Sequence, residues 1–152
     1  MKMISAIVFL LFLFICSYSV LAQSPTERLI LATLTSNGYS HREAKLWVKV
    51  SKVETDNYKS NLFCNHNNMW GMNFVRRGRK TTCLYRVWYN GRPTRFAGFK
   101  TPEDGVQDLV YWLDHVGFPK DFKDINTFCQ YMKKNHYFEE SYDQYFQLLK
   151  SK

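Results

Sequence analysis

The sequence predicts a mainly α-helical (α+β) fold with one small β-hairpin, and three observations support this. First, helix-starting sequences recur along the chain, each with a Ser or Thr three positions before an acidic or amide residue. Second, residues 82–99 alternate as strands do, around an Asn-Gly pair. Third, the 152 residues are 45% hydrophobic and 17% aromatic, which suits one globular domain and excludes a disordered or collagen-like chain.

Residues 1–22 have the layout of a secretory signal peptide. Lys2 gives a positive start, an apolar run occupies 7–15, and Val20-Leu21-Ala22 offers a small-residue cleavage site. The alternative is an uncleaved membrane anchor, but this run is short against the roughly 20 apolar residues that a span needs. We therefore expect an exported protein, periplasmic or extracellular, whose single domain covers 23–152 and does not stay inserted in a membrane.

Helices are expected in most of the remaining chain. Ser24 with Glu27, and Ser40 with Glu43, form capping boxes that open the first two. Residues 57–80 show no helical period and are rich in Asn, Gly and Arg. The expected helices run over about 25–37, 41–54, 102–117, 125–135 and from 142 onward.

The hairpin prediction depends on Asn90-Gly91, because both positions of a two-residue type I′ turn need positive φ. The alternating residues 83–89 give the first strand. Thr94 and Phe96 belong to the return strand, and Pro93 marks that strand as an edge.

The net charge of +8 comes from 21 Lys and Arg against 13 Asp and Glu. A basic exported protein suits an anionic partner such as cell-wall polymer, a lipid surface or nucleic acid, and charge alone does not choose among them. No stretch resembles a nucleic-acid-binding motif, so we expect no nucleic-acid partner.

Cys64, Cys83 and Cys129 lack the spacing of zinc ligands, and two of them can pair in an oxidising compartment. We expect a monomer without metal or cofactor.

Glu54 stands on the apolar face of the second helix. At about 100° per residue it falls about 20° from Trp47, on the arc that also holds Ala44 and Val50. Burying an ionised carboxylate there costs free energy unless a cation pairs with it or water hydrates it. Apolar surroundings raise its pKa, and general acid catalysis requires such a raised pKa. The alternative is a structural role, in which Glu54 accepts hydrogen bonds from loop amides or pairs with an Arg from 76–79.

The residues that follow Glu54 extend this pattern. Tyr58-Lys59-Ser60 comes next, and then Asn67-Asn68-Met69-Trp70-Gly71-Met72. This order of a helix-ending Glu, a Ser and an Asn-Asn-apolar-aromatic-Gly-apolar turn resembles the glucosaminidase-type (family 73-like) peptidoglycan hydrolases of the lysozyme superfamily. Residues 94–109 and 137–142 are similar to further segments of that family.

The resemblance implies a lysozyme-like helical domain that cleaves N-acetylglucosaminyl linkages in peptidoglycan glycan strands by general acid catalysis through Glu54. It implies that Tyr137 and Tyr142 support the catalysis. Flat rings stack on sugars and amides bond N-acetyl groups, so the expected substrate-binding residues are Ser60, Asn67, Asn68, Trp70 and Trp88. Core packing is the alternative for the aromatic residues. We expect a cleft between the end of the second helix and the hairpin, with Glu54 at its floor.

The second catalytic group stays open at this point. Glycosidases normally use two carboxyl groups, and the candidates near Glu54 or the late tyrosines are Asp56, Glu139, Glu140 and Asp143. Two other functions also stay open: a catalytically silent module that binds or assembles cell wall on the same scaffold, and a basic antimicrobial or membrane-surface protein.

Overall fold

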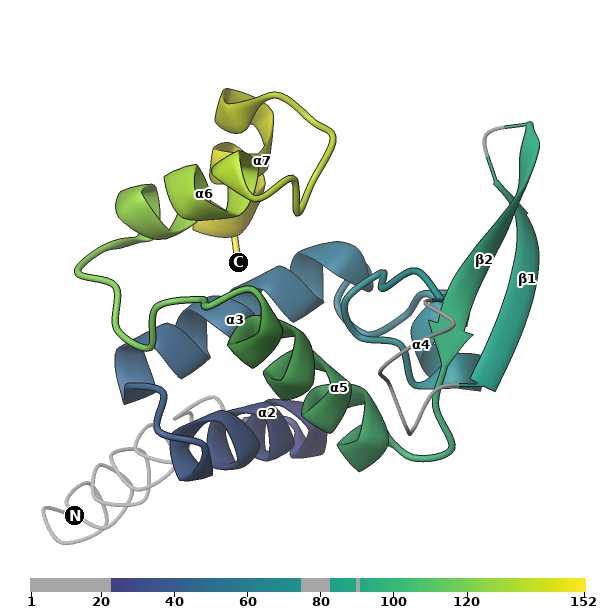
Figure 1. Ribbon diagram of the computed structural model, residues 1–152, viewed down its shortest axis with the longest axis horizontal. Coiled ribbons are helices and arrows are strands. Elements are labelled where there is room, and N and C mark those ends of the chain that lie inside the picture. The colour runs from purple at the N-terminus through teal and green to yellow at the C-terminus, as the bar shows by residue number, and fades with distance from the viewer. Residues whose placement is uncertain (1–22, 75–82, 90) are drawn as a thin grey trace, which may run out of the picture.

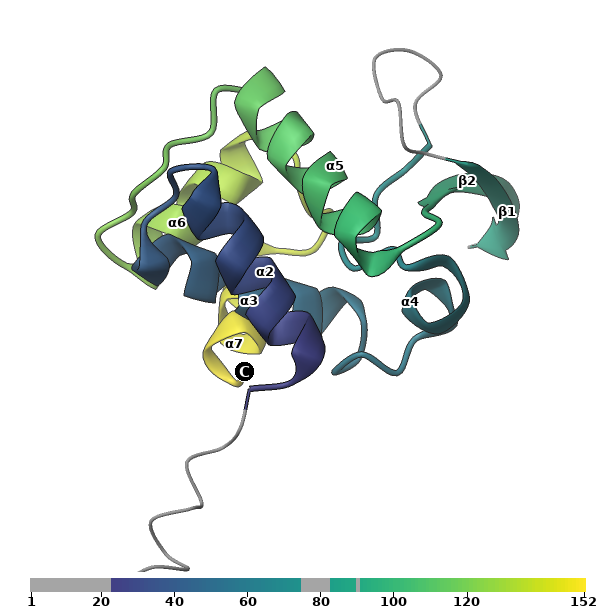
Figure 2. The same ribbon diagram turned by 90° about the horizontal axis from the view of Figure 1, so that it is seen from below.

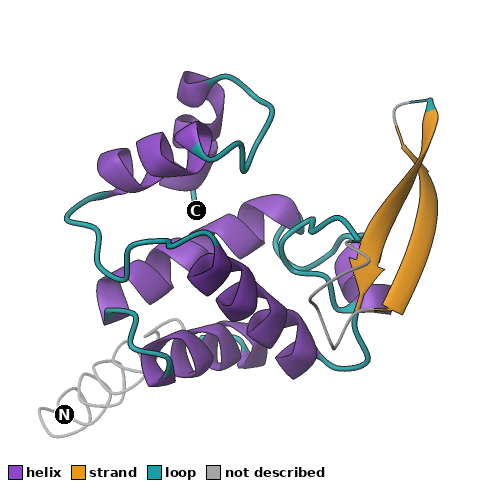
Figure 3. Cartoon of the chain, in the orientation of Figure 1, coloured by secondary structure: helices purple, strands orange, loops and turns teal. Residues whose placement is uncertain are grey.

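A computed structural model describes residues 23–74, 83–89 and 91–152 of the chain. Helices make up most of the described chain, and the two strands form one antiparallel hairpin (Figure 3). This confirms the predicted fold class, whereas the predicted signal peptide, 1–22, lies outside the described residues. The elements are α2 (Pro25–Ser36), α3 (His41–Glu54), α4 (Asn61–His66), β1 (Cys83–Tyr89), β2 (Arg92–Gly98), α5 (Pro102–His115), α6 (Ile125–Lys134) and α7 (Tyr142–Lys150).

The predicted helix starts are correct for α2, α5 and α7. At α2, Ser24 Oγ accepts from the Glu27 amide at 3.2 Å, and the Glu27 carboxylate accepts from the Ser24 amide at 3.2 Å. Ser141 and Gln144 make the same reciprocal pair at α7, and Thr101 caps α5. Each cap satisfies amides that the first turn of a helix leaves without an intrahelical partner.

The second capping box is only half correct. Ser40 Oγ accepts from the Glu43 amide at 3.1 Å, as predicted, but the Glu43 carboxylate turns inward and accepts from Trp47 Nε1 at 3.3 Å. The Ser40 amide instead donates to the Lys120 carbonyl at 2.9 Å. Glu43 lies one turn before Trp47 on the buried face of α3, so its side chain follows that face into the core.

Helix α3 is the centre of the core, between the α6–α7 pair and the α2–α5 pair (Figure 1). The side chain of Trp47 is fully buried, and four rings pack edge-on against it. Their centroids lie 5.3–6.0 Å from the Trp47 ring, and they belong to Trp70, Phe118, Phe128 and Tyr137. This one side chain therefore joins segments that are distant in the sequence. No helix of the described residues is long and apolar enough to cross a membrane.

Helix α4 was not expected, because six residues are too few to show a helical period. Both of its ends are capped: Ser60 Oγ accepts from the Phe63 amide at 3.3 Å, and Asn67 ends the helix at φ 51°. Such a short helix is stable only through caps and tertiary contacts.

The hairpin has the predicted two-residue turn, since Tyr89 pairs with Arg92 and Gly91 has φ 72°, although Asn90 lies outside the described residues. Figures 1 and 2 both show the hairpin at one end of the molecule, remote from α6. It is fixed to the body by the Ala97 amide, which donates to the Met72 carbonyl at 2.9 Å.

Gly105, in the first turns of α5, lies directly against the loop formed by 67–72. A Cβ at this position would lie 2.5 Å from the Asn67 carbonyl oxygen. Replacing a helical Gly by Ala normally stabilises by about 1 kcal/mol. For Gly105→Ala we expect the opposite, a loss of about 1–3 kcal/mol, because the loop backbone must move. Urea denaturation measures this, and a more stable variant would contradict the tight contact.

Candidate active site

A cleft of about 320 Å³ opens at the C-terminal end of α3. Its lining includes that helix end, the hairpin and the connection from α6 to α7, and the first two are the elements between which the sequence predicted a cleft. Figure 1 shows where these three elements lie in the fold. Aromatic and apolar side chains share its lining with carboxylates and small polar groups. The lining residues are Glu54, Leu62, Gly71, Asn73, Thr94, Phe96, Tyr137, Phe138, Glu139 and Glu140.

The two carboxylate oxygens of Glu54 differ in their surroundings. Oε1 accepts a hydrogen bond of 2.7 Å from the hydroxyl of Tyr145. Oε2 forms no hydrogen bond or ion pair with any residue in the described ranges, and it lies 3.1 Å from the place that a Cβ of Gly71 would occupy. The absence of a side chain at Gly71, whose φ is +61°, therefore leaves room for Oε2 beside the cleft.

Burial raises the pKa of Glu54 to about 7. The hydrogen bond from Tyr145 opposes this rise in pKa, and the negative charge of Glu140 adds to it. Burial likewise raises the pKa of Tyr145 far above its ordinary value, so its hydroxyl keeps the proton that it donates. A carboxyl with a pKa near 7 is partly protonated at neutral pH and can give a proton to a bound molecule.

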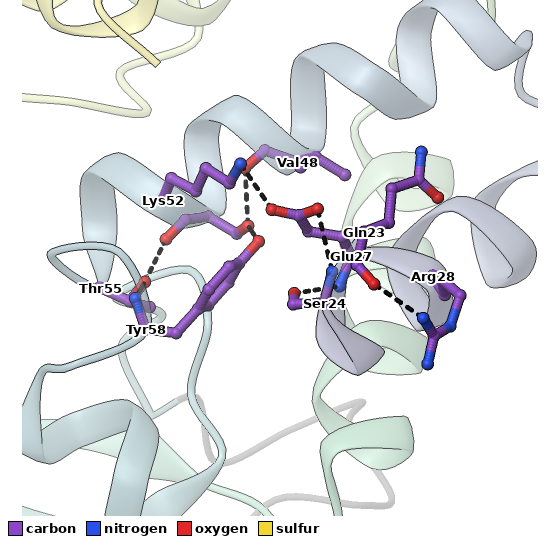
Figure 4. Close-up of polar contacts among 9 residues, drawn as sticks. Gln23, Ser24, Glu27, Arg28, Val48, Lys52, Thr55 and Tyr58 are labelled. Atoms are coloured by element: carbon purple, nitrogen blue, oxygen red, sulfur yellow. Dashed lines mark hydrogen bonds and ion pairs between the residues drawn. The ribbon is translucent and has the colours of Figure 1, made fainter. Parts of the chain in front are cut away.

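The backbone that carries Glu54 is held tightly just beyond the helix. Asp56, Asn57 and Tyr58 are consecutive left-handed residues, with φ of 47°, 54° and 66°. The hydroxyl of Thr55 donates to the Ser51 carbonyl at 2.5 Å and accepts from the Tyr58 amide at 2.9 Å (Figure 4). Such residues cost about 1–2 kcal/mol each and persist only where the surroundings fix them.

This same end of α3 is also tied to the start of α2. Lys52 Nζ lies 2.5 Å from Glu27 Oε1, and the hydroxyls of Ser51 and Tyr58 share a hydrogen bond of 2.9 Å (Figure 4). Glu54 therefore stands on a rigid element, which a functional carboxyl requires.

Asn68 organises the loop beneath the cleft and does not line it. Its Nδ2 donates to the carbonyls of Met72, at 2.9 Å, and Ala97, at 2.8 Å. Its Oδ1 accepts from the amides of Trp70, at 3.2 Å, and Met72, at 3.1 Å. The side chain is 1% exposed, so none of its groups is left for a sugar.

The other expected substrate-binding residues have comparable structural partners. Ser60 caps α4, and Asn67 Nδ2 donates to the Phe99 carbonyl at 3.0 Å. Trp70 is 2% exposed, with Nε1 donating to the Gly105 carbonyl at 3.1 Å. None of these three lines the cleft. Trp88 pairs with Pro93 in the hairpin, and its side chain lies outside the described part of the structure.

The late tyrosines divide between the cleft and the surface. Tyr137 lines the cleft, and its hydroxyl donates to the Trp70 carbonyl at 3.3 Å. Tyr142 does not line it: its hydroxyl bonds Asn126, and its ring stacks on Phe146 at 5.5 Å. Tyr145, which the sequence analysis did not select, is the tyrosine that contacts Glu54. The signal was available, because Tyr145 and Leu149 lie one helical turn apart on the buried face of α7.

Two of the four candidate second carboxylates line the cleft. They are Glu139 and Glu140, both exposed, whereas Asp56 and Asp143 are exposed away from the cleft lining. No group of three or more His, Cys, Asp or Glu side chains in the described ranges could hold a metal ion. Cys64 and Cys129 carry free thiols.

Glu43 is a fully buried carboxyl outside the cleft, and burial raises its pKa from its ordinary value of 4.5 to about 7. Between these values the unfolded chain loses this proton first, so the free energy of unfolding falls with rising pH, by up to about 3 kcal/mol. Glu54 acts in the same direction. We expect Glu43→Gln to remove roughly half of the fall between about pH 4.5 and 7. Urea denaturation across that pH range tests this, and an unchanged slope would contradict it.

The comparison with solved structures finds a crystal structure of a peptidoglycan hydrolase mutant from Sphingomonas sp. A1. The TM-score is 0.58 at 17% sequence identity, over 82% of this chain and 88% of that chain. At this identity the likeness shows a shared fold, which is lysozyme-like and rich in α-helix. No protein-family model matches the sequence, and no curated protein matches it.

Proposed function

We propose that this protein is an exported peptidoglycan hydrolase, a glycosidase that cleaves N-acetylglucosaminyl linkages in glycan strands with Glu54 as general acid. The observation that carries the proposal is Glu54 itself, a carboxyl with a pKa near 7 that lines a cleft on one side and accepts from Tyr145 on the other. The fold shared with a peptidoglycan hydrolase supports the same class of substrate. The net charge of +8 favours an anionic polymer.

In this mechanism the proton leaves Oε2 of Glu54, the oxygen without a hydrogen-bond partner among the described residues. It passes to the glycosidic oxygen as the bond to the anomeric carbon breaks. Tyr145 holds Oε1, so the orientation of the carboxyl is kept and the charge left on it is stabilised. Positive charge develops on the sugar ring, and Glu140 is the carboxylate best placed to offset it, because it lines the cleft and its charge acts on Glu54. A water molecule then adds to the anomeric carbon and gives up a proton, which restores the protonated form of Glu54.

Digestion of purified peptidoglycan, followed by reduction and mass analysis of the new ends, tests the proposal. We expect reducing ends on N-acetylglucosamine. Ends on N-acetylmuramic acid would place the cleavage at the other linkage. Binding without any new ends, on peptidoglycans of several chemotypes, would favour the silent wall-binding module instead.

The pH dependence of kcat/KM offers a paired prediction. Only protonated Glu54 is active as the acid, so activity falls above its pKa. Glu140→Gln removes a charge that raises this pKa, and we expect the alkaline limb to move to lower pH. Tyr145→Phe removes a bond that lowers the pKa, and we expect the limb to move to higher pH. Asp143→Asn, outside the cleft, is the control. Shifts in the same direction for both variants would contradict the assignment.

A further inference from the structure

One wall of the cleft is a short irregular segment, 137–140, that connects α6 to α7. All four of its residues line the cleft, and Glu139 and Glu140 are exposed. An irregular wall keeps its shape only if its backbone groups find partners. The partner of two of its carbonyls is a single side chain from the last turn of α6.

That side chain is Lys133. Its Nζ donates to the Glu140 carbonyl at 2.7 Å and to the Glu139 carbonyl at 3.3 Å. The same ammonium lies 5.1 Å from the centroid of the Phe138 ring, within the range of a cation–π contact. Lys133 forms no ion pair with a carboxylate in the described ranges, so its charge is directed at backbone oxygens and a ring.

Phe138 connects Lys133 to Glu54 through Tyr145. Its ring is buried and stacks on the ring of Tyr145, with centroids 3.9 Å apart and planes 6° from parallel. The hydroxyl of Tyr145 then donates to Glu54 Oε1 at 2.7 Å. A continuous series of contacts therefore runs from Lys133 through Phe138 and Tyr145 to Glu54.

We propose that Lys133 is a positioning residue, which fixes the 137–140 wall of the cleft and, through Phe138 and Tyr145, the orientation of Glu54. This inference rests on the proposed function only for its consequence in catalysis. Lys133 touches no substrate in this role, and its effect is to hold other groups in place. Misplacement of a catalytic group by about 1 Å can reduce a rate by up to about 10²-fold.

The test compares Lys133→Met with Lys134→Met and Lys133→Arg. Lys134 is the neighbouring exposed lysine, whose side chain makes none of these contacts, and Arg can restore donors to the carbonyls. A protease that cleaves after Glu reports on the wall without any substrate. We expect Lys133→Met to be cut after Glu139 or Glu140 about 10-fold faster than the wild type, since cleavage follows local opening.

The second readout is the pH dependence of kcat/KM, which reports on the pKa of Glu54. Tyr145 and Glu140 act on the pKa of Glu54, and the charge of Glu54 in turn raises the pKa of Tyr137. All three residues belong to the wall or to the helix after it. A looser wall admits water and moves Glu140 away, and burial is the largest cause of the raised pKa of Glu54, so we expect that pKa to fall. We expect kcat/KM to drop about 10-fold, with the alkaline limb at lower pH. Lys133→Arg should restore most of both properties.

The outcomes separate this inference from the proposed function. If the wild type cleaves no peptidoglycan, the proposed function fails, and titration of the Glu54 carboxyl carbon by NMR still measures the effect of Lys133. If the wild type is active but Lys133→Met keeps its cleavage rate by the protease and its pH profile, the positioning role is wrong. Equal effects of Lys134→Met would also overturn it, because they would show a general response to lost charge.

Discussion

Glu54→Gln is expected to lose most of the glycan cleavage and to keep the fold, because the proposed mechanism needs the proton of Glu54. Gln keeps the size of the side chain and an oxygen that accepts from Tyr145, but it has no proton to transfer. The expected loss in kcat is about 10²–10⁴-fold, the usual contribution of a positioned general acid. Release of reducing ends from peptidoglycan measures the rate, and circular dichroism verifies folding.

Asp56→Asn is the matched control for this variant. Asp56 lies two positions from Glu54, is exposed and does not line the cleft. Its φ of 47° is one that Asn adopts readily, so the backbone is not strained further. We expect nearly wild-type activity. Full activity in Glu54→Gln, or an equal loss in Asp56→Asn, would remove Glu54 as the acid.

The second large effect is expected on stability, from Asn68→Ala. Four hydrogen bonds are lost at once, and the backbone groups of Trp70, Met72 and Ala97 that made them stay near the buried site. A buried polar group without a partner costs about 1–3 kcal/mol. Allowing for relaxation and water entry, we expect a loss of about 3 kcal/mol or more in the free energy of unfolding. Urea denaturation measures it.

Asn67→Gly is the control for Asn68→Ala. It removes a single hydrogen bond, to Phe99, and relieves a left-handed residue with φ 51°, so its net effect should stay within about 1 kcal/mol. A stable Asn68→Ala protein with a raised KM would instead support the sugar-binding role that the sequence suggested.

Helix positions and the place of Glu54 could be predicted because both depend on local geometry. Capping residues act within three positions, and the phase of a helix is fixed by its pitch. The apolar face of α3 therefore predicted the buried side of Trp47 and the inward direction of Glu54. Where a local rule met a tertiary alternative it failed, as at Ser40, whose amide donates to the distant Lys120 carbonyl and not to the Glu43 carboxylate.

The roles of Asn67, Asn68 and Trp70 could not be predicted from residue type. The side-chain amide of Asn and the indole of Trp can form hydrogen bonds with a sugar or with the protein backbone equally well. Each of them has a distant partner here, 32, 29 and 35 residues away, at Phe99, Ala97 and Gly105, and Asn68 also bonds the nearby Trp70 and Met72. Only the tertiary fold decides between the two uses. For the late tyrosines, helical spacing predicts that Tyr145 is buried, but only the tertiary fold pairs Tyr145 with Glu54 and Tyr142 with Asn126.

The bond between Tyr145 and Glu54 joins two residues that are 91 positions apart. During biosynthesis α3 leaves the ribosome long before α7 does, so Glu54 emerges without the hydroxyl that orients it and without the wall that shields it. A nascent chain therefore holds Glu54 in an open, hydrated setting, where a carboxyl has an ordinary acidity and is a poor proton donor at neutral pH. The order of synthesis alone delays the assembly of the cleft around Glu54 until the last helix has been made and packed.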